Sequence, residues 1–122
     1  MAYKFSKEFL NESLSYDEYI SLTERLALEG RTTGEDQSPE RIEYTKLNAQ
    51  RMRRIHKTTD VMKDFVDVLK EKQHWVLIAE PWCGDAANMV PLIGKIAEVS
   101  DKISLHILLR DEHTNVMDEY LT

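Results

Sequence analysis

The chain contains few cysteines, prolines and glycines, with one, three and four among its 122 residues. The single cysteine, Cys83, excludes a disulfide within the chain. Basic residues are also scarce, since 16 Lys and Arg stand against 22 Asp and Glu and the formal net charge is −6. Affinity for nucleic acid rests mainly on basic side chains that neutralise phosphates. We therefore expect no nucleic-acid partner and, for the same reason, no membrane partner.

Long hydrophobic runs are missing as well. The longest, WVLIA at 75–79 and ILL at 107–109, are far too short to span a bilayer. The N-terminal stretch has no sustained apolar segment of the kind that a signal peptide needs. We therefore expect a cytoplasmic protein whose cysteine stays reduced. With 42% hydrophobic and 31% charged residues, the composition suits one compact, helix-rich domain with a buried core.

Sites for metals or anions find little support in the sequence. The histidines, at 56, 74, 106 and 113, are scattered, and no spacing of His, Cys or carboxylates resembles a zinc site, so we expect no metal. We interpret His106 as a strand-surface residue or a hydrogen-bonded core residue. The one basic cluster, RMRRIHK at 51–57, is interpreted as a solvated helix face. The alternative, an RNA or anionic-ligand patch, lacks the interleaved aromatic residues that stack bases.

Helix signals dominate the first half of the chain. Ser15 and Glu18 form a capping box before an apolar stripe with 3–4 spacing, and Gly30 is a natural C-terminal cap. This pattern predicts a helix over 16–29. Ser38 followed by a proline predicts the beginning of a second helix.

The extent of the second helix is open. A stripe in which five of seven side chains are apolar lies along one side of a helix, at positions 48, 52, 55, 59, 62, 66 and 69. Either one helix runs from about 39 to 71, or two helices meet near Thr58 and Thr59, whose β-branched side chains weaken the middle. We interpret the stripe as packing against the protein's own core. A coiled-coil seam between chains is the alternative.

After residue 72 the pattern is typical of an α/β unit. An apolar run predicts a strand at 75–80, and alternating side chains predict another at 103–110. The segment between them has the spacing of an amphipathic helix interrupted by Pro91. Strand, helix and strand form a βαβ unit, whose strands are expected to be parallel with a right-handed crossover. A last short helix is expected near the end, carrying apolar residues at 116, 120 and 121.

The stretch at 75–91, WVLIAEPWCGDAANMVP, resembles the active-site strand, turn and helix of the thioredoxin superfamily. It contains an apolar strand, a turn with Trp82, Cys83 and Gly84, and a proline eight residues after the cysteine, Pro91. The resemblance covers residues 58–122. It implies a partial thioredoxin-like fold preceded by a helical N-terminal extension, residues 1–57, and we expect the two parts to form one compact unit.

The variant with Gly-Asp-Ala after the cysteine is more specific. Together with LLRDEHTNVMDEYLT at 108–122, it is similar to a small subgroup of thioredoxin-like proteins with a WCGDA motif. Ala86 stands where ordinary thioredoxins have their second active-site cysteine, and Leu77 stands where they have a buried acid. We also expect the portion of the fold given by this sequence to end before the cis-proline loop, as in a truncated thioredoxin-like protein.

The resemblance implies monothiol redox activity as a first hypothesis. Cys83 would be the nucleophile, forming a mixed disulfide with glutathione or a protein thiol, and Trp82, Gly84 and Asp85 would shape the binding turn. No cofactor is expected. A thiol in the first turn of a helix favours the thiolate, whereas the carboxylate of Asp85 opposes it. Glu80 is the one nearby candidate acid.

Alternatives to catalysis remain at this point. Cys83 can equally be interpreted as a retained structural cysteine. The chain would then be a non-enzymatic helical interaction module on a thioredoxin-like scaffold. A glutaredoxin-like variant would hold glutathione or an iron–sulfur cluster across a dimer, but no glutathione-binding residues are recognisable. A sheet of two strands has unpaired edges and is too small for independent stability unless helices cover it. We therefore predict a homodimer, joined by strand pairing or by the long helix.

Overall fold

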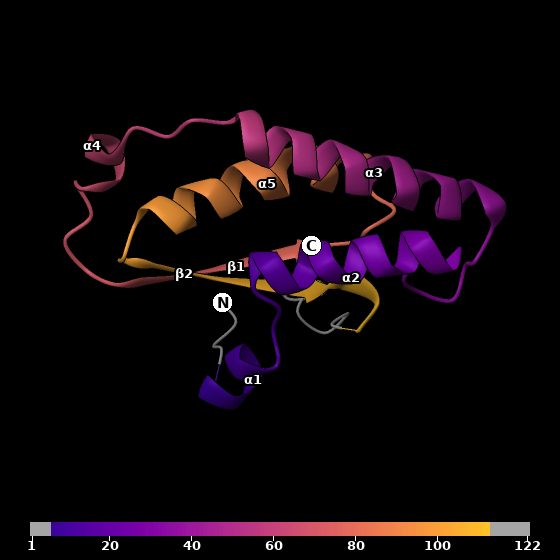
Figure 1. Cartoon of the computed structure of the whole chain (residues 1–122). Coiled ribbons are helices and arrows are strands. Elements are labelled where there is room, and N and C mark those ends of the chain that lie inside the picture. The colour runs from indigo at the N-terminus through magenta and orange to yellow at the C-terminus, as the bar shows by residue number, and fades with distance from the viewer. Residues whose placement is uncertain (1–5, 113–122) are drawn as a thin grey trace.

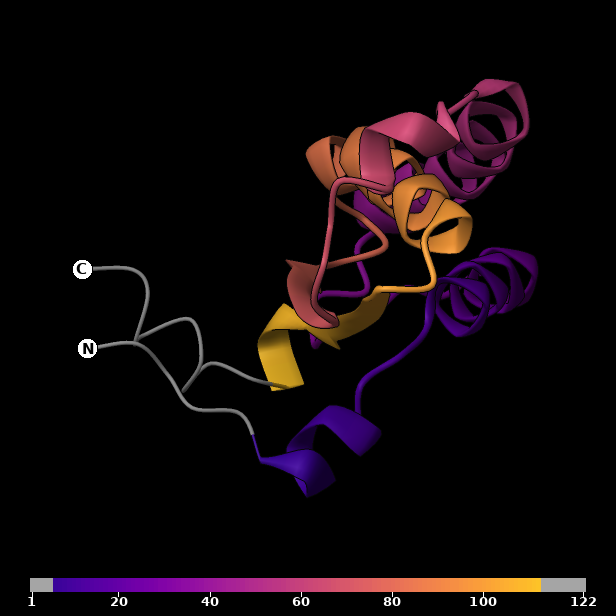
Figure 2. The same cartoon turned by 90° about the vertical axis from the view of Figure 1, so that its left-hand side faces the viewer.

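A computed structural model of the protein describes residues 6–112. The elements in chain order are α1 (Lys7–Asn11), α2 (Tyr16–Glu29), α3 (Pro39–Thr58), α4 (Lys63–Val66), β1 (Gln73–Ala79), α5 (Gly84–Val99), β2 (Ile103–Leu109) and the 3-10 helix η1 (Arg110–Glu112). Helices α2, α3 and α5 lie on one side of the two strands, and α1 lies on the other (Figures 1 and 2). The last short helix expected from the sequence, with its residues 116, 120 and 121, lies outside the described residues.

Helix α2 begins and ends where its local chemistry predicts. The Ser15 hydroxyl accepts a hydrogen bond from the Glu18 N–H at 3.1 Å, and the Glu18 carboxylate accepts one from the Ser15 N–H at 2.9 Å. Gly30 ends the helix in the left-handed conformation, with φ of 69°, which glycine adopts without steric cost. The predicted helix over 16–29 is confirmed.

The bounds of helix α3 decide between the one-helix and the two-helix predictions for this part of the chain. Ser38 caps its beginning, Pro39 is its first residue, and it ends at Thr58, so a single helix from 39 to 71 is wrong. The Thr58 hydroxyl donates to the Arg54 carbonyl at 2.9 Å, a local bond that competes with continued helix. Along the stripe, Met52 is 1% exposed whereas Met62 is 72% exposed. The stripe is therefore buried along α3 and again at Val66 in α4, which is 6% exposed, but not at Met62 between them.

The strands form the parallel βαβ unit expected from the sequence. Strands β1 and β2 pair in parallel, from Gln73 opposite Ile103 to Ala79 opposite Leu109, and α5 connects them. Pro91 lies inside α5 and is buried. The fold is α/β, a partial thioredoxin-like unit preceded by helices.

One sheet edge is paired in a way that the sequence did not indicate. Leu14, between α1 and α2, forms an antiparallel bridge with Ile107 on the outer edge of β2. The N–H of each residue donates to the carbonyl of the other at 2.8 Å. The other edge of β1 pairs with no strand among residues 6–112.

The core lies between the strands and the helices α2, α3 and α5. Its buried residues are Tyr19, Ile20, Met52, Ala79, Ala87, Val90, Ile107 and Leu109. Helices α2 and α5 approach closely at Gly94, where an added Cβ would lie 2.6 Å from the Tyr16 ring. In the described part of the chain, no helix combines the length and the apolar character needed to cross a membrane.

Candidate functional site

The single cysteine lies where β1 passes into α5. Residues 80–83 form a turn closed by the Cys83 N–H, which donates to the Glu80 carbonyl at 2.9 Å. Cys83 is the N-cap of α5, and its side chain makes no capping hydrogen bond. The half-buried sulfur is therefore beside the N–H groups of the first helical turn, which lack partners within the helix and favour negative charge.

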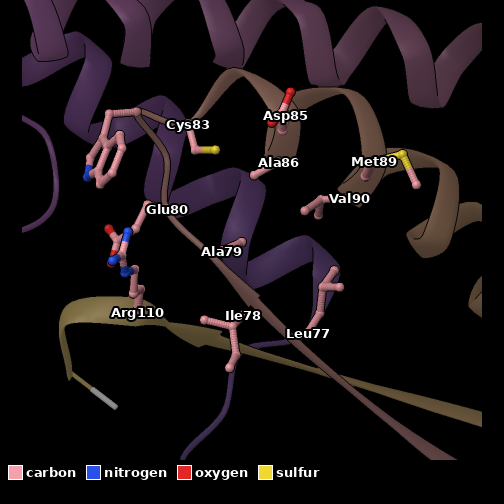
Figure 3. A pocket seen from close by; sticks show the side chains of 11 residues that line it. Leu77, Ile78, Ala79, Glu80, Cys83, Asp85, Ala86, Met89, Val90 and Arg110 are labelled. Atoms are coloured by element: carbon pink, nitrogen blue, oxygen red, sulfur yellow. The ribbon is translucent and has the colours of Figure 1, made fainter. Parts of the chain in front are cut away.

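An apolar cavity of about 340 Å³ opens beside this sulfur. Strand β1 contributes Leu77, Ile78 and Ala79 to its wall, and α5 contributes Ala86, Met89 and Val90. In Figure 3 the Cys83 sulfur points into this cavity toward Ala86. The residue that replaces a second cysteine therefore lines the same space as the first.

All four predicted site residues line one polar hollow, and three of them also line the apolar cavity. Trp82, Cys83 and Asp85 line both the apolar cavity and a second, more polar hollow of about 430 Å³, whereas Gly84 lines only the second. Glu80 and Arg110 lie at the border of the first cavity (Figure 3). The turn thus brings the four predicted residues together around the polar hollow.

Helix α3 holds this turn through two contacts that sequence reasoning missed. The buried Asn48 side chain donates from Nδ2 to the Pro81 carbonyl at 2.9 Å. The Arg41 guanidinium lies over the Trp82 ring, 3.9 Å from its centroid, in a cation–π contact. The one available signal was Asn48 itself, an amide within an otherwise apolar stripe.

The loop before α3 holds the turn from another side. Glu80 is 2% exposed, and its carboxylate accepts a hydrogen bond from the Thr33 hydroxyl. The neighbouring Thr32 is anchored in turn, because its hydroxyl lies 2.6 Å from that of Thr45 in α3. The helical N-terminal part therefore supplies much of the support for the turn that carries Cys83.

Beneath the turn lies Tyr19 of α2, which is fully buried. Burial raises the pKa of its phenol well above the ordinary range, and the nearby Glu80 and Cys83 act in the same direction. Its hydroxyl has no hydrogen-bond partner among the described residues. The site therefore favours the neutral form of the Tyr19 phenol.

The arrangement around Cys83 suits thiol chemistry. Among residues 6–112, no group of three or more His, Cys, Asp or Glu side chains is placed to hold a metal ion. A thiol that borders an apolar cavity at a helix N-terminus suits nucleophilic attack on a disulfide.

A thioredoxin family model matches residues 34–122. The chain belongs to the thioredoxin family. The match begins in the loop before α3 and so includes α3 as well as the βαβ unit. No curated protein and no solved structure matches the chain. The division of this thioredoxin-family chain into an extension at 1–57 and a thioredoxin-like portion at 58–122 stays a prediction.

Proposed function

We propose that this thioredoxin-family chain is a monothiol redox protein of the WCGDA subgroup, in which Cys83 forms mixed disulfides with glutathione or with a protein thiol. The observation that carries the proposal is the position of the Cys83 sulfur at the N-terminus of α5, directed into the apolar cavity. A reducing cytoplasm, the location proposed here, keeps such a thiol available.

The step is a thiol–disulfide exchange with glutathione disulfide as the oxidant. The Cys83 thiolate attacks one sulfur of the disulfide, and a bond between Cys83 and glutathione forms as the glutathione disulfide bond breaks. Cys83 is oxidised, one glutathione is reduced, and the departing thiolate takes up a proton. Trp82 and Asp85, which line the cavity with Cys83, would contact the incoming disulfide.

Ala86 determines the fate of the mixed disulfide. Ordinary thioredoxins resolve a mixed disulfide with a second cysteine, and alanine has no thiol to do so. The adduct on Cys83 therefore persists until an external thiol attacks it. For this reason we expect no thioredoxin-like turnover in the reduction of insulin.

The test is to incubate the reduced protein with glutathione disulfide and to measure the intact mass. We expect one glutathionyl group per chain, removable by dithiothreitol, and none on the Cys83→Ser variant. The Ala86→Cys variant restores the two-cysteine spacing and is expected to form an internal disulfide instead. An unmodified native chain under conditions that modify the denatured chain would contradict the proposal.

A second candidate function, a non-enzymatic helical interaction module, is favoured by exposed apolar side chains on α3. Tyr44 and Leu47 lie one turn apart on this helix and are 47% and 49% exposed. The proposed homodimer would use α3 or the edge of β1 that pairs with no strand among residues 6–112. Sedimentation equilibrium at micromolar concentration distinguishes a dimer from a monomer, and Leu47→Lys tests the α3 surface.

A further inference from the structure

Two histidines meet on the sheet face opposite the helices. Leu105 and Ile107 of β2 point toward the core, so His106 between them points to the other face. Its registered partner on β1 is Val76, and His74 is the diagonal neighbour on the same face. His74 Nδ1 lies 2.9 Å from His106 Nε2.

The N-terminal segment determines which nitrogen of His106 carries the hydrogen. His106 Nδ1 lies 2.9 Å from the Ser13 hydroxyl oxygen and 3.3 Å from the Leu10 carbonyl oxygen. A carbonyl oxygen only accepts, so the hydrogen is assigned to Nδ1. His106 Nε2 consequently presents its lone pair toward His74. Metal-binding histidines are oriented in this way, by a hydrogen bond from their other ring nitrogen to a carbonyl or a carboxylate.

The separation of the two nitrogens suits a metal ion. Imidazole nitrogens bind transition ions at about 2.0–2.1 Å, so two such ligands at a right angle stand about 2.8–3.0 Å apart. The observed 2.9 Å between His74 Nδ1 and His106 Nε2 falls in this range. Ligands at right angles are those of square-planar and octahedral ions, and nitrogen ligands in tetragonal geometry favour Cu²⁺ and Ni²⁺.

We propose that His74 and His106 form a two-histidine site for a divalent transition ion, with Cu²⁺ bound more tightly than Ni²⁺ or Zn²⁺. Water would fill the remaining positions, since His74 is exposed to solvent. When the ion binds, the hydrogen on His74 Nδ1 moves to Nε2 of the same ring. Both histidines therefore bind the ion in their neutral form, and neither releases a proton. The site is independent of the redox function proposed above.

The experiment is a titration of the full chain with Cu²⁺, followed by calorimetry and by electron paramagnetic resonance. The Cys83→Ser substitution is present throughout, because a thiolate competes for the metal. We expect one Cu²⁺ per chain, with a hyperfine pattern from two nitrogens. His74→Gln and His106→Gln should each weaken binding at least about tenfold, and Ser13→Ala should weaken it about tenfold through lost orientation of His106.

His56→Gln is the matched control, because His56 is a histidine bonded to Glu98 on the helical side of the molecule at 2.7 Å. It should leave the Cu²⁺ affinity unchanged, and circular dichroism confirms that each variant is folded. Cu²⁺ should also raise the Tm of the His56→Gln variant, but it should not raise the Tm of folded His106→Gln. The site is overturned if neither His74 nor His106 affects the affinity, or if His56→Gln weakens it equally.

Discussion

The two faces of the small sheet differ in the polar contacts that they carry. On the inner face, Ile107 and Ala79 are packed against helices, with no more than 5% exposure, so burial of apolar surface holds them. On the outer face, His74 and His106 bond to one another, and His106 bonds to the segment between α1 and α2. The outer face also buries Leu108, which is 1% exposed, so what distinguishes this face is its pair of titratable histidines, which the inner face lacks.

The largest effect should come from truncating the inner face. Ile107 is fully buried, so Ile107→Ala removes core packing and is expected to lower the free energy of unfolding by about 2–5 kcal/mol. Val76→Ala, in the neighbouring strand on the outer face, should cost about 1 kcal/mol or less. Urea denaturation measures both. Equal losses would show that the two faces contribute alike.

A smaller effect is expected where α5 meets α2. Gly94→Ala places a methyl group against the Tyr16 ring and should cost about 1–3 kcal/mol, less the roughly 1 kcal/mol that alanine gains in a helix. Gly84→Ala is the matched control, since the nearest atom to its added Cβ is 3.9 Å away. Thermal unfolding of the two variants compares them. A Gly94→Ala variant as stable as Gly84→Ala would contradict this close approach.

The contact between α3 and the cysteine turn should have two effects. Asn48→Ala leaves the buried Pro81 carbonyl without its donor and is expected to cost about 1–3 kcal/mol. The rate at which iodoacetamide alkylates Cys83 should change as well, because the turn loses a support. Gln50→Ala, at a position of the same helix outside this contact, should change neither quantity. An unaltered alkylation rate in folded Asn48→Ala would mean that the other contacts suffice.

The smallest effect concerns pH and the outer face. Burial lowers the pKa of His106, so the unfolded chain binds this proton at a higher pH than the folded chain does. The free energy of unfolding should therefore fall as the pH drops below about 6.5, the ordinary histidine value. Urea denaturation with a chelator present should show a weaker fall for His106→Gln than for His56→Gln. Identical pH dependence in the two variants would remove His106 as the cause.

The fold could be read from the sequence where its signals are local. The capping box at Ser15, the glycine after α2 and the Ser38-Pro39 pair each act within one helical turn, and all three predicted the observed helix ends. The two strands were also found, although β1 is Gln73–Ala79 and not 75–80. Residue 80 instead begins the turn, because its carbonyl accepts the Cys83 N–H.

Only part of the candidate site could be predicted from the sequence. The predicted site residues are consecutive in the chain, namely Trp82, Cys83, Gly84 and Asp85. Their proximity could therefore be predicted without knowledge of the fold. Their supports, Arg41 and Asn48, come from a helix that was predicted to be an extension outside the thioredoxin-like part. No short-range pattern connects a residue of α3 to a turn more than thirty positions later.

The sequence by itself determined both ends of α2, the beginning of α3, the parallel strand–helix–strand unit and the place of Cys83 at the beginning of α5. These depend on backbone preferences and on hydrogen bonds between near neighbours in the chain. Only the tertiary structure decided that Leu14 pairs with Ile107 and that His74 meets His106. Such contacts depend on strand register and on which apolar faces pack together, and those are set by burial across the whole core.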